Sequence, residues 1–158
     1  LNRISQYDLP IMKELLYLKD EQIKDFIQLL YDAYREISSD PKEILSKRLF
    51  GLAHLRALNL IERNPGINPS ELIFRLKITK QSLNRVLREL IKIKLVKESK
   101  NDNDTRKKNL ILTKEGQTFF DKLYESQKSR MFYALKKSDP GSVIKFKEVL
   151  NNIINGKK

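Results

Sequence analysis

The chain has 158 residues, which is enough for one ordinary domain or for a small domain with helical extensions. It contains no cysteine and one histidine, His54, which excludes disulfides, thiolate chemistry and a histidine-based metal cluster within one chain. We expect no cofactor. No stretch of the sequence approaches about 18 consecutive apolar residues, the length that a membrane-spanning helix needs. No apolar N-terminal signal segment is visible either, so the expectation is a soluble cytoplasmic protein without a membrane partner.

Positive charge is concentrated in one part of the chain. The formal net charge is +12, which favours a polyanionic partner. Residues 75–108 contain 12 Lys and Arg against 4 Asp and Glu, whereas residues 1–39 contain 5 against 7. A protein that is basic throughout would not need this difference in charge between its segments. We therefore expect the binding surface around residues 75–108.

Two helices are predicted near the N-terminus. Residues 9–18 favour a short helix behind Asp8, which can cap it. Apolar residues then recur at helical spacing over residues 20–38 and form a broad stripe.

A strong helix-start pattern follows these two helices. Asp40 can cap a helix, Pro41 suits the first helical position, and Glu43 completes the spacing of a capping box. The pattern predicts a helix from about residue 41 to residue 63, in which Gly51 is the position where a break could occur.

The middle of the chain has the pattern of two helices joined by a short turn. Asn-Pro-Gly at 64–66 predicts a turn, and residues 69–76 favour a short helix. Thr79 is placed to cap the next helix, which is predicted to end near Ile93.

The period of the apolar residues then changes from helical to strand-like. Short strands are predicted over residues 95–99 and 108–113, joined by a polar turn over 100–107. The pattern indicates a hairpin with a long, charged tip, after which Thr113 can cap another helix.

A long helix over 114–137 and a final helix that ends near Asn155 complete the predicted elements. A helix-turn-helix followed at once by a charged hairpin is the winged helix-turn-helix pattern. We therefore predict a mainly α fold with a small β-hairpin wing (α+β). Residues 40–113 form its DNA-binding domain, and residues 1–39 and 114–158 form a helical dimerisation region.

The helix that begins after Thr79 has two different faces. Its apolar residues recur at the spacing of one helix face, which suits packing on a small core. Its other face carries amides and guanidiniums, which pair bidentately with adenine and guanine in a DNA major groove. Solvated helix surface is the alternative, but the surrounding positive charge and the hairpin favour double-stranded DNA. The expected contact residues are Thr79, Lys80, Gln81, Ser82, Asn84, Arg85 and Arg88.

Residues 50–116 resemble the MarR family of bacterial transcription regulators, from "HLRALNLIERNPGINPSELIFRLK" through "ITKQSLNRVLRELIKIKLVKE" to "NDTRKKNLILTKEG". The segment "ITKQSLNRVL" is similar to an alphaproteobacterial branch of PetP- and LdtR-like regulators. Asp104 and Arg106 match the family's Asp-x-Arg wing motif, which implies that the arginine enters the minor groove and that the aspartate helps to hold it. The alternative for Asp104 is an ordinary turn residue. Lys107 and Lys108 are either phosphate contacts or ordinary hairpin polarity.

The sequence departs from the family pattern at two turns. Lys77 and Lys94 stand where glycine is common, at the helix-turn-helix turn and after the recognition helix. If their backbone is left-handed, each costs about 1 kcal/mol or more. Asn101 and Asn103 stand where family wings often carry charge.

Aromatic-rich stripes lie on the helices at both ends of the chain. They exceed what one small lobe can bury, which favours a homodimer that binds an inverted-repeat operator. The resemblance also implies a pocket for a small aromatic effector, lined by Tyr31, Tyr34, Phe50 and His54. Plain packing is the alternative for each of these four side chains, and a hydrogen-bonded interface residue is the alternative for His54.

Three functions remain to be compared. The pattern favours a dimeric, sequence-specific transcription regulator whose DNA affinity a small molecule alters. The alternative is a sequence-tolerant nucleic-acid-binding or architectural protein, whose affinity would be set by phosphate charge alone. An enzyme is disfavoured, because the chain has no glycine-rich phosphate loop and no paired carboxylates beside a suitable base.

Overall fold

The computed structural model describes residues 16–101 and 104–156, and within these the side chains of residues 16–99 and 109–156. The chain forms two compact units, Leu1–Ser39 and Asp40–Lys158. In the first unit, helix α2 (Asp20–Ser39) confirms the second predicted helix. The helix predicted over residues 9–18 lies almost entirely outside the described residues.

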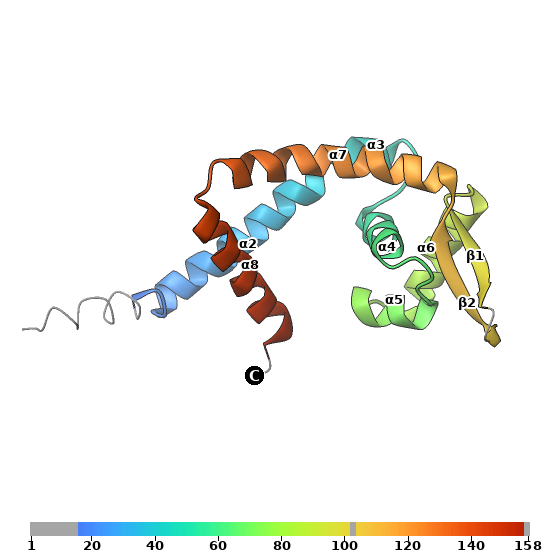
Figure 1. Cartoon of the computed structure of the whole chain (residues 1–158), viewed down its shortest axis with the longest axis horizontal. Helices are drawn as coiled ribbons and strands as arrows, with labels where there is room; N and C mark the ends of the chain where they lie inside the picture. The colour runs from blue at the N-terminus through green and yellow to red at the C-terminus, as the bar shows by residue number, and fades with distance from the viewer. Residues whose placement is uncertain (1–15, 102–103, 157–158) are drawn as a thin grey trace, which may run out of the picture. The chain divides into compact units, whose positions relative to one another are not determined.

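The second unit contains six helices and a hairpin among its described residues (Figure 1). Helices α4, α5 and α6 gather beside the two strands, and the long helix α7 starts at the hairpin and leads away from it. This arrangement confirms the mainly helical fold with a small β wing. The elements are α3 (Lys42–Ser46), α4 (Leu52–Arg63), α5 (Pro69–Leu76), α6 (Lys80–Lys92), β1 (Val96–Asn101), β2 (Asp104–Leu112), α7 (Lys114–Lys136) and α8 (Pro140–Asn155).

The core of the second unit forms where one face of each helix meets the base of the hairpin. Helix α4 supplies its centre, since Ala57, Leu58 and Ile61 are fully buried. The predicted apolar face of α6 is confirmed. Burying one such side chain stabilises the fold by about 1.5–3 kcal/mol, so this face fixes the rotation of α6 about its axis. The buried residues of α6 are Leu83, Val86, Leu87 and Leu90.

Side-chain caps start the helices where the sequence predicts them. The Thr79 hydroxyl accepts a hydrogen bond from the Ser82 amide at 3.1 Å, and the Thr113 hydroxyl accepts one from the Gly116 amide at 2.9 Å. Asn68 does the same for the Glu71 amide at the start of α5. Each cap satisfies an amide that has no partner inside its helix.

The helix predicted from about residue 41 to residue 63 is divided into α3 and α4, and the second helix starts after Gly51, where the sequence allowed a break. Leu49 takes a left-handed conformation with φ 57°, and Gly51 is extended at the start of α4. The amides of Leu49 and Phe50 bond the carbonyls of Ser46 and Leu45, which is the hydrogen-bond pattern of a Schellman helix end. A leucine in this position gives no sequence signal for a helix end.

The predicted capping role of Asp40 is also wrong. The residue before α3 is Pro41, and no side chain caps this helix. The Asp40 carboxylate instead accepts two hydrogen bonds from the Arg130 guanidinium of α7, at 2.7 and 2.8 Å. The arginine satisfies the carboxylate that the sequence pattern assigned to the helix start.

The hairpin is longer than predicted. Its strands pair antiparallel from Val96 opposite Leu112 to Lys100 opposite Lys108, followed by an irregularity and the pair Asn101 and Asp104. Most of the segment predicted as a polar turn is therefore strand. Asn and Asp are depleted in strands, so composition alone favoured a turn there.

Candidate nucleic-acid interface

Helices α5 and α6 form a helix-turn-helix whose turn is fixed by the backbone. Lys77 is left-handed, with φ 53° and ψ 48°, as expected if this lysine takes the place of a turn glycine. From α4, the Arg56 guanidinium donates a hydrogen bond to the Leu76 carbonyl at 2.8 Å. This bond satisfies a carbonyl at the end of α5 that has no partner within the helix.

The polar face of α6 is open to solvent. All seven residues predicted on this helix to contact DNA are exposed, and the apolar face holds the helix to the core beneath them. Two of the seven also serve the helix itself, since the Thr79 hydroxyl caps α6 and donates a hydrogen bond to the Ser82 hydroxyl at 2.9 Å. The exposed residues are Thr79, Lys80, Gln81, Ser82, Asn84, Arg85 and Arg88.

The one carboxylate of α6 has a specific position. One oxygen of Glu89 lies 3.3 Å from Nε of Arg85, and the other lies 2.7 Å from Nε2 of His54 in α4. The hydrogen bond from His54, followed by the one from Arg85, lowers the pKa of Glu89. Spacing along one helix cannot predict this link, because 35 residues separate its two ends.

The far end of α6 is anchored beside the hairpin. Lys94 is left-handed with φ 59°, and the amides of Lys94 and Leu95 bond the carbonyls of Ile91 and Leu90. This is a Schellman motif with lysine where glycine is usual. The Thr113 hydroxyl, besides capping α7, donates to the Lys94 carbonyl at 2.6 Å. Helix α6, the hairpin and α7 therefore meet at one point.

The wing continues from the helix-turn-helix as one structure. Two residues just before α5 bond the backbone of the hairpin. The Ile67 carbonyl accepts a hydrogen bond from the Leu110 amide at 2.9 Å, and the Gly66 amide donates one to the Leu110 carbonyl at 3.0 Å. The backbone of the predicted wing contacts lies in β2, but their side chains lie outside the described residues. These are Asp104, Arg106, Lys107 and Lys108.

The four residues predicted to line an effector pocket have different environments. Tyr31 and Tyr34 are exposed side chains of α2, in the first unit. Phe50 is half-buried and stacks on the buried His54, with ring centroids 4.3 Å apart and planes 10° apart. The structure therefore brings Phe50 and His54 together as packed rings.

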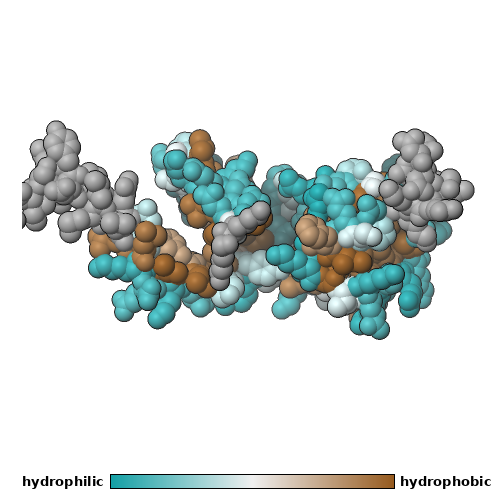
Figure 2. Space-filling model, turned by 90° about the horizontal axis from the view of Figure 1, so that it is seen from below, coloured by the Kyte–Doolittle hydropathy of each residue, from teal (hydrophilic) through white to brown (hydrophobic). Residues whose placement is uncertain are grey.

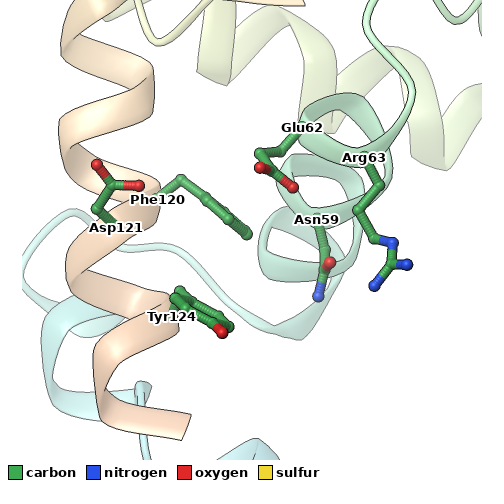
Figure 3. Close-up of a pocket in the computed structure, with 6 residues that line it drawn as sticks. All are labelled: Asn59, Glu62, Arg63, Phe120, Asp121 and Tyr124. Atoms are coloured by element: carbon green, nitrogen blue, oxygen red, sulfur yellow. The ribbon is translucent and has the colours of Figure 1, made fainter. Parts of the chain in front are cut away.

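Two hollows lie beside α7 in the second unit. In the first, of about 600 Å³, Phe120 and Tyr124 project from α7 towards α4, and Glu62 projects from α4 towards them (Figure 3). A carboxylate facing two aromatic rings disfavours an anionic ligand. Asn59, Arg63 and Asp121 complete its lining.

The second hollow, of about 410 Å³, is lined mainly by positively charged side chains. Arg48 lies over the Phe119 ring, with its guanidinium carbon 4.9 Å from the ring centroid, and two lysines of α7 also line the hollow. Such a site attracts an anion, although Glu115 reduces the effect. The lining residues are Arg48, Lys114, Glu115, Thr118, Phe119 and Lys122.

Comparison with known proteins identifies this arrangement. Residues 50–107 match the model of the MarR family. The chain is also 40% identical over 141 residues to the HTH-type transcriptional regulator PetP of Rhodobacter capsulatus, covering 89% of this chain and 85% of PetP. The chain belongs to the MarR family. It is a DNA-binding transcriptional regulator, and the likeness to PetP confirms the PetP part of the predicted branch.

Several solved structures share the fold. A MarR-family regulator from Silicibacter pomeroyi has a TM-score of 0.73 at 18% identity, covering 87% of this chain and 92% of its own. FabT of Streptococcus pneumoniae, solved in complex with DNA, has a TM-score of 0.70 at 15% identity over 86% and 95%. NadR, solved with 4-hydroxyphenylacetate, has a TM-score of 0.69 at 22% identity over 84% and 92%.

Within the described residues, no helix combines the length and apolarity needed to cross a membrane.

Proposed function

We propose that this MarR-family regulator binds specific operator sequences by placing α6 in the major groove. The observation that carries the proposal is the exposed polar face of α6, held in a fixed orientation by its buried opposite face. Asn84 suits adenine, and Arg85 and Arg88 suit guanine, since each can form two hydrogen bonds to the base edge. The hairpin that follows α6 is the wing, and Asp104, Arg106, Lys107 and Lys108 belong to it.

The active form is proposed to be a homodimer that binds an inverted repeat. Among the described residues, neither α2 nor α8 has a buried side chain, although both carry large apolar residues. Apolar side chains reach the surface as brown patches between hydrophilic ones (Figure 2). A two-fold dimer would cover such faces and present two recognition helices to half-sites about one helical turn apart, roughly 10 bp.

Regulation is proposed to come from a small aromatic anion. NadR, a structural neighbour, was solved with 4-hydroxyphenylacetate. In this chain the second hollow offers cations at Arg48, Lys114 and Lys122, and the Arg48 guanidinium covers the buried Phe119 ring. The carboxylate of an aromatic anion could meet these cations while its ring stacks on the exposed guanidinium of Arg48. Phe50 packs edge-to-face on Phe119 at 6.2 Å, so the one half-buried residue of the predicted pocket is adjacent to this hollow.

Genomic footprinting with the purified protein, followed by titration of the operator it finds, tests the DNA proposal. We expect Arg85→Ala and Asn84→Ala to reduce discrimination between operator and random DNA by about 1–3 kcal/mol for each base pair contacted. Lys137→Ala, at the exposed end of α7, is the matched loss of one charge away from α6 and should leave discrimination unchanged. Equal affinity of the wild type for operator and random DNA would support the sequence-tolerant alternative instead.

Thermal unfolding with 4-hydroxyphenylacetate tests the effector proposal. Binding should raise the melting temperature and change operator affinity, and Arg48→Ala should reduce both effects. Arg63→Ala, which removes an equal charge from the first hollow, is the control. An equal response of both variants would place the ligand elsewhere.

A further inference from the structure

Glu89 accepts hydrogen bonds from two groups on opposite sides of it. Oε2 contacts Nε2 of His54 at 2.7 Å, and Oε1 contacts Nε of Arg85 at 3.3 Å. A carboxylate can accept both bonds because both of its oxygens are acceptors, whereas an amide of the same shape has only one. This position therefore needs glutamate in particular.

The histidine end of this link is fixed. The Gly51 amide donates to Nδ1 of His54 at 3.2 Å, so in the neutral ring the proton is on Nε2 and points at Glu89. The imidazole is 7% exposed and stacked on Phe50, which prevents it from turning. His54 thus holds the Glu89 carboxylate of α6 in one position beside α4.

The arginine end of the link is free to contact DNA. The Arg85 side chain is 80% exposed, and its bond to Glu89 uses Nε. The two terminal amino groups, Nη1 and Nη2, are the pair that would meet O6 and N7 of guanine end-on. Arginine loses rotamer freedom when it binds, so a carboxylate that already restrains the guanidinium lowers this loss.

We propose that Glu89 and His54 are positioning residues for base recognition, which hold the Arg85 guanidinium ready to contact one guanine of the operator. This inference rests on the proposed function, in which α6 contacts bases. It assigns a use to the only carboxylate of α6: Glu89 sets specificity at one base pair without touching DNA itself.

The test compares the affinities for the operator and for operators changed at single base pairs, by fluorescence anisotropy. Arg85→Ala first identifies the base pair at which discrimination is lost. Glu89→Gln should then reduce discrimination at that base pair alone, by about five- to tenfold. In the Arg85→Ala background, Glu89→Gln should have no further effect on discrimination.

Glu71→Gln is the matched control. Glu71 also pairs with an arginine four residues along the helix, Arg75 of α5, and its side chain is 39% exposed against 37% for Glu89. Both variants remove one negative charge from the DNA-binding lobe and should raise affinity for all DNA similarly. Only Glu89→Gln should change base discrimination.

A spectroscopic measurement checks the link without DNA. His54 is the sole histidine of the chain, so nitrogen NMR of the imidazole reports on this site alone. We expect the neutral ring to carry its proton on Nε2 and the Nε2 signal to change in Glu89→Gln. A proton on Nδ1 would overturn the hydrogen-bond assignment.

The possible failures are distinguishable. If Arg85→Ala changes discrimination at no base pair, the proposed recognition by α6 fails. If Arg85→Ala acts at one base pair but Glu89→Gln behaves like Glu71→Gln, the positioning role is wrong and recognition by α6 stands.

Discussion

Single residues hold the parts of the second unit in contact, and at Gly116 helix α7 approaches another segment's backbone directly. A Cβ at Gly116 would lie 1.9 Å from the Leu95 carbonyl oxygen, which is backbone and cannot move aside. The first turn of α7 therefore touches the chain between α6 and β1 directly, and only glycine fits there.

We predict that Gly116→Ala destabilises the protein by about 1–3 kcal/mol, because the first turn of α7 must separate from Leu95. Urea unfolding at constant protein concentration measures the change. Gly141→Ala in α8 is the control, since its Cβ would meet only the Asp139 side chain at 3.1 Å. We expect a change within about 1 kcal/mol for Gly141→Ala. Equal effects of the two variants would contradict the close approach at Leu95.

The Asp40–Arg130 ion pair predicts a dependence of stability on pH. Its hydrogen bonds from Arg130 lower the pKa of Asp40, and only 15% of the Asp40 side chain is exposed. A carboxylate whose pKa falls on folding stabilises the protein fully above its ordinary pKa. This contribution decreases as the pH drops through the ordinary value and is lost below the lowered one.

We expect Asp40→Asn to cost about 0.5–1 kcal/mol near pH 7, and the difference from the wild type to disappear in strong acid. Unfolding free energies measured from pH 7 down to about pH 3 would show the two curves converging. Glu148→Gln is the control, because Glu148 makes only an exposed pair with Lys145. A constant difference between Asp40→Asn and wild type at all pH values would exclude the ion pair as its cause.

At the scale of elements, the helix-turn-helix could be predicted because its signals are local. The predicted caps at Thr79 and Thr113 and the apolar face of α6 depend on residues within one or two turns, and the structure has each of them. Lys77 and Lys94 also proved left-handed, as expected for residues at glycine positions.

The elements that could not be predicted depend on distant partners. Asp40 looks like a helix cap until Arg130, 90 residues away, takes its carboxylate. Glu89 looks like one more polar residue until His54 lies beside it. The strand pairing around Lys100 and Lys108 overrides the turn-like composition of the segment. Spacing in the sequence contains none of this information.

The left-handed lysine at the end of α6 predicts a stabilising substitution. Lys94→Gly relieves a left-handed conformation that costs about 1 kcal/mol or more in a residue with a Cβ. Glycine also makes the unfolded chain more flexible, which destabilises the folded state by slightly less than this. We therefore expect stabilisation of up to about 1 kcal/mol. Lys92→Gly, inside the last turn of the same helix, should instead destabilise by about 1 kcal/mol.

Urea unfolding of the two lysine variants at one protein concentration provides the measurement. Both remove one lysine from the same end of α6, so their shared loss of charge cancels in the comparison. Destabilisation by Lys94→Gly equal to that by Lys92→Gly would show that the backbone strain at Lys94 is relieved by its surroundings.

At the scale of the whole molecule, the terminal helices carry apolar surface that the single chain leaves open. On α8, Phe146 and Ile153 are seven residues apart and so share one helix face, with 50% and 57% of their surfaces exposed. On α2, Ile23, Phe26 and Ile27 form a similar face. Soluble proteins seldom leave large apolar patches uncovered, so a second copy of the chain is the expected cover.

We predict that the wild type sediments at about twice 18.6 kDa at micromolar concentration, and that Phe146→Glu with Ile153→Glu shifts it towards the monomer. Lys147→Glu, on the same helix but at an exposed lysine, should leave the dimer intact. If the double variant stays monomeric, its affinity for an operator with two half-sites should be close to its affinity for a single half-site.

In the wild type, binding of the first α6 helix holds the second near its own half-site and can raise the affinity by about 10²–10⁴. Inserting about 5 bp between half-sites turns the second site to the far side of the duplex and should remove the same advantage from the wild type. If the double variant stays dimeric and keeps its preference for the paired site, the α8 face is not the dimer interface.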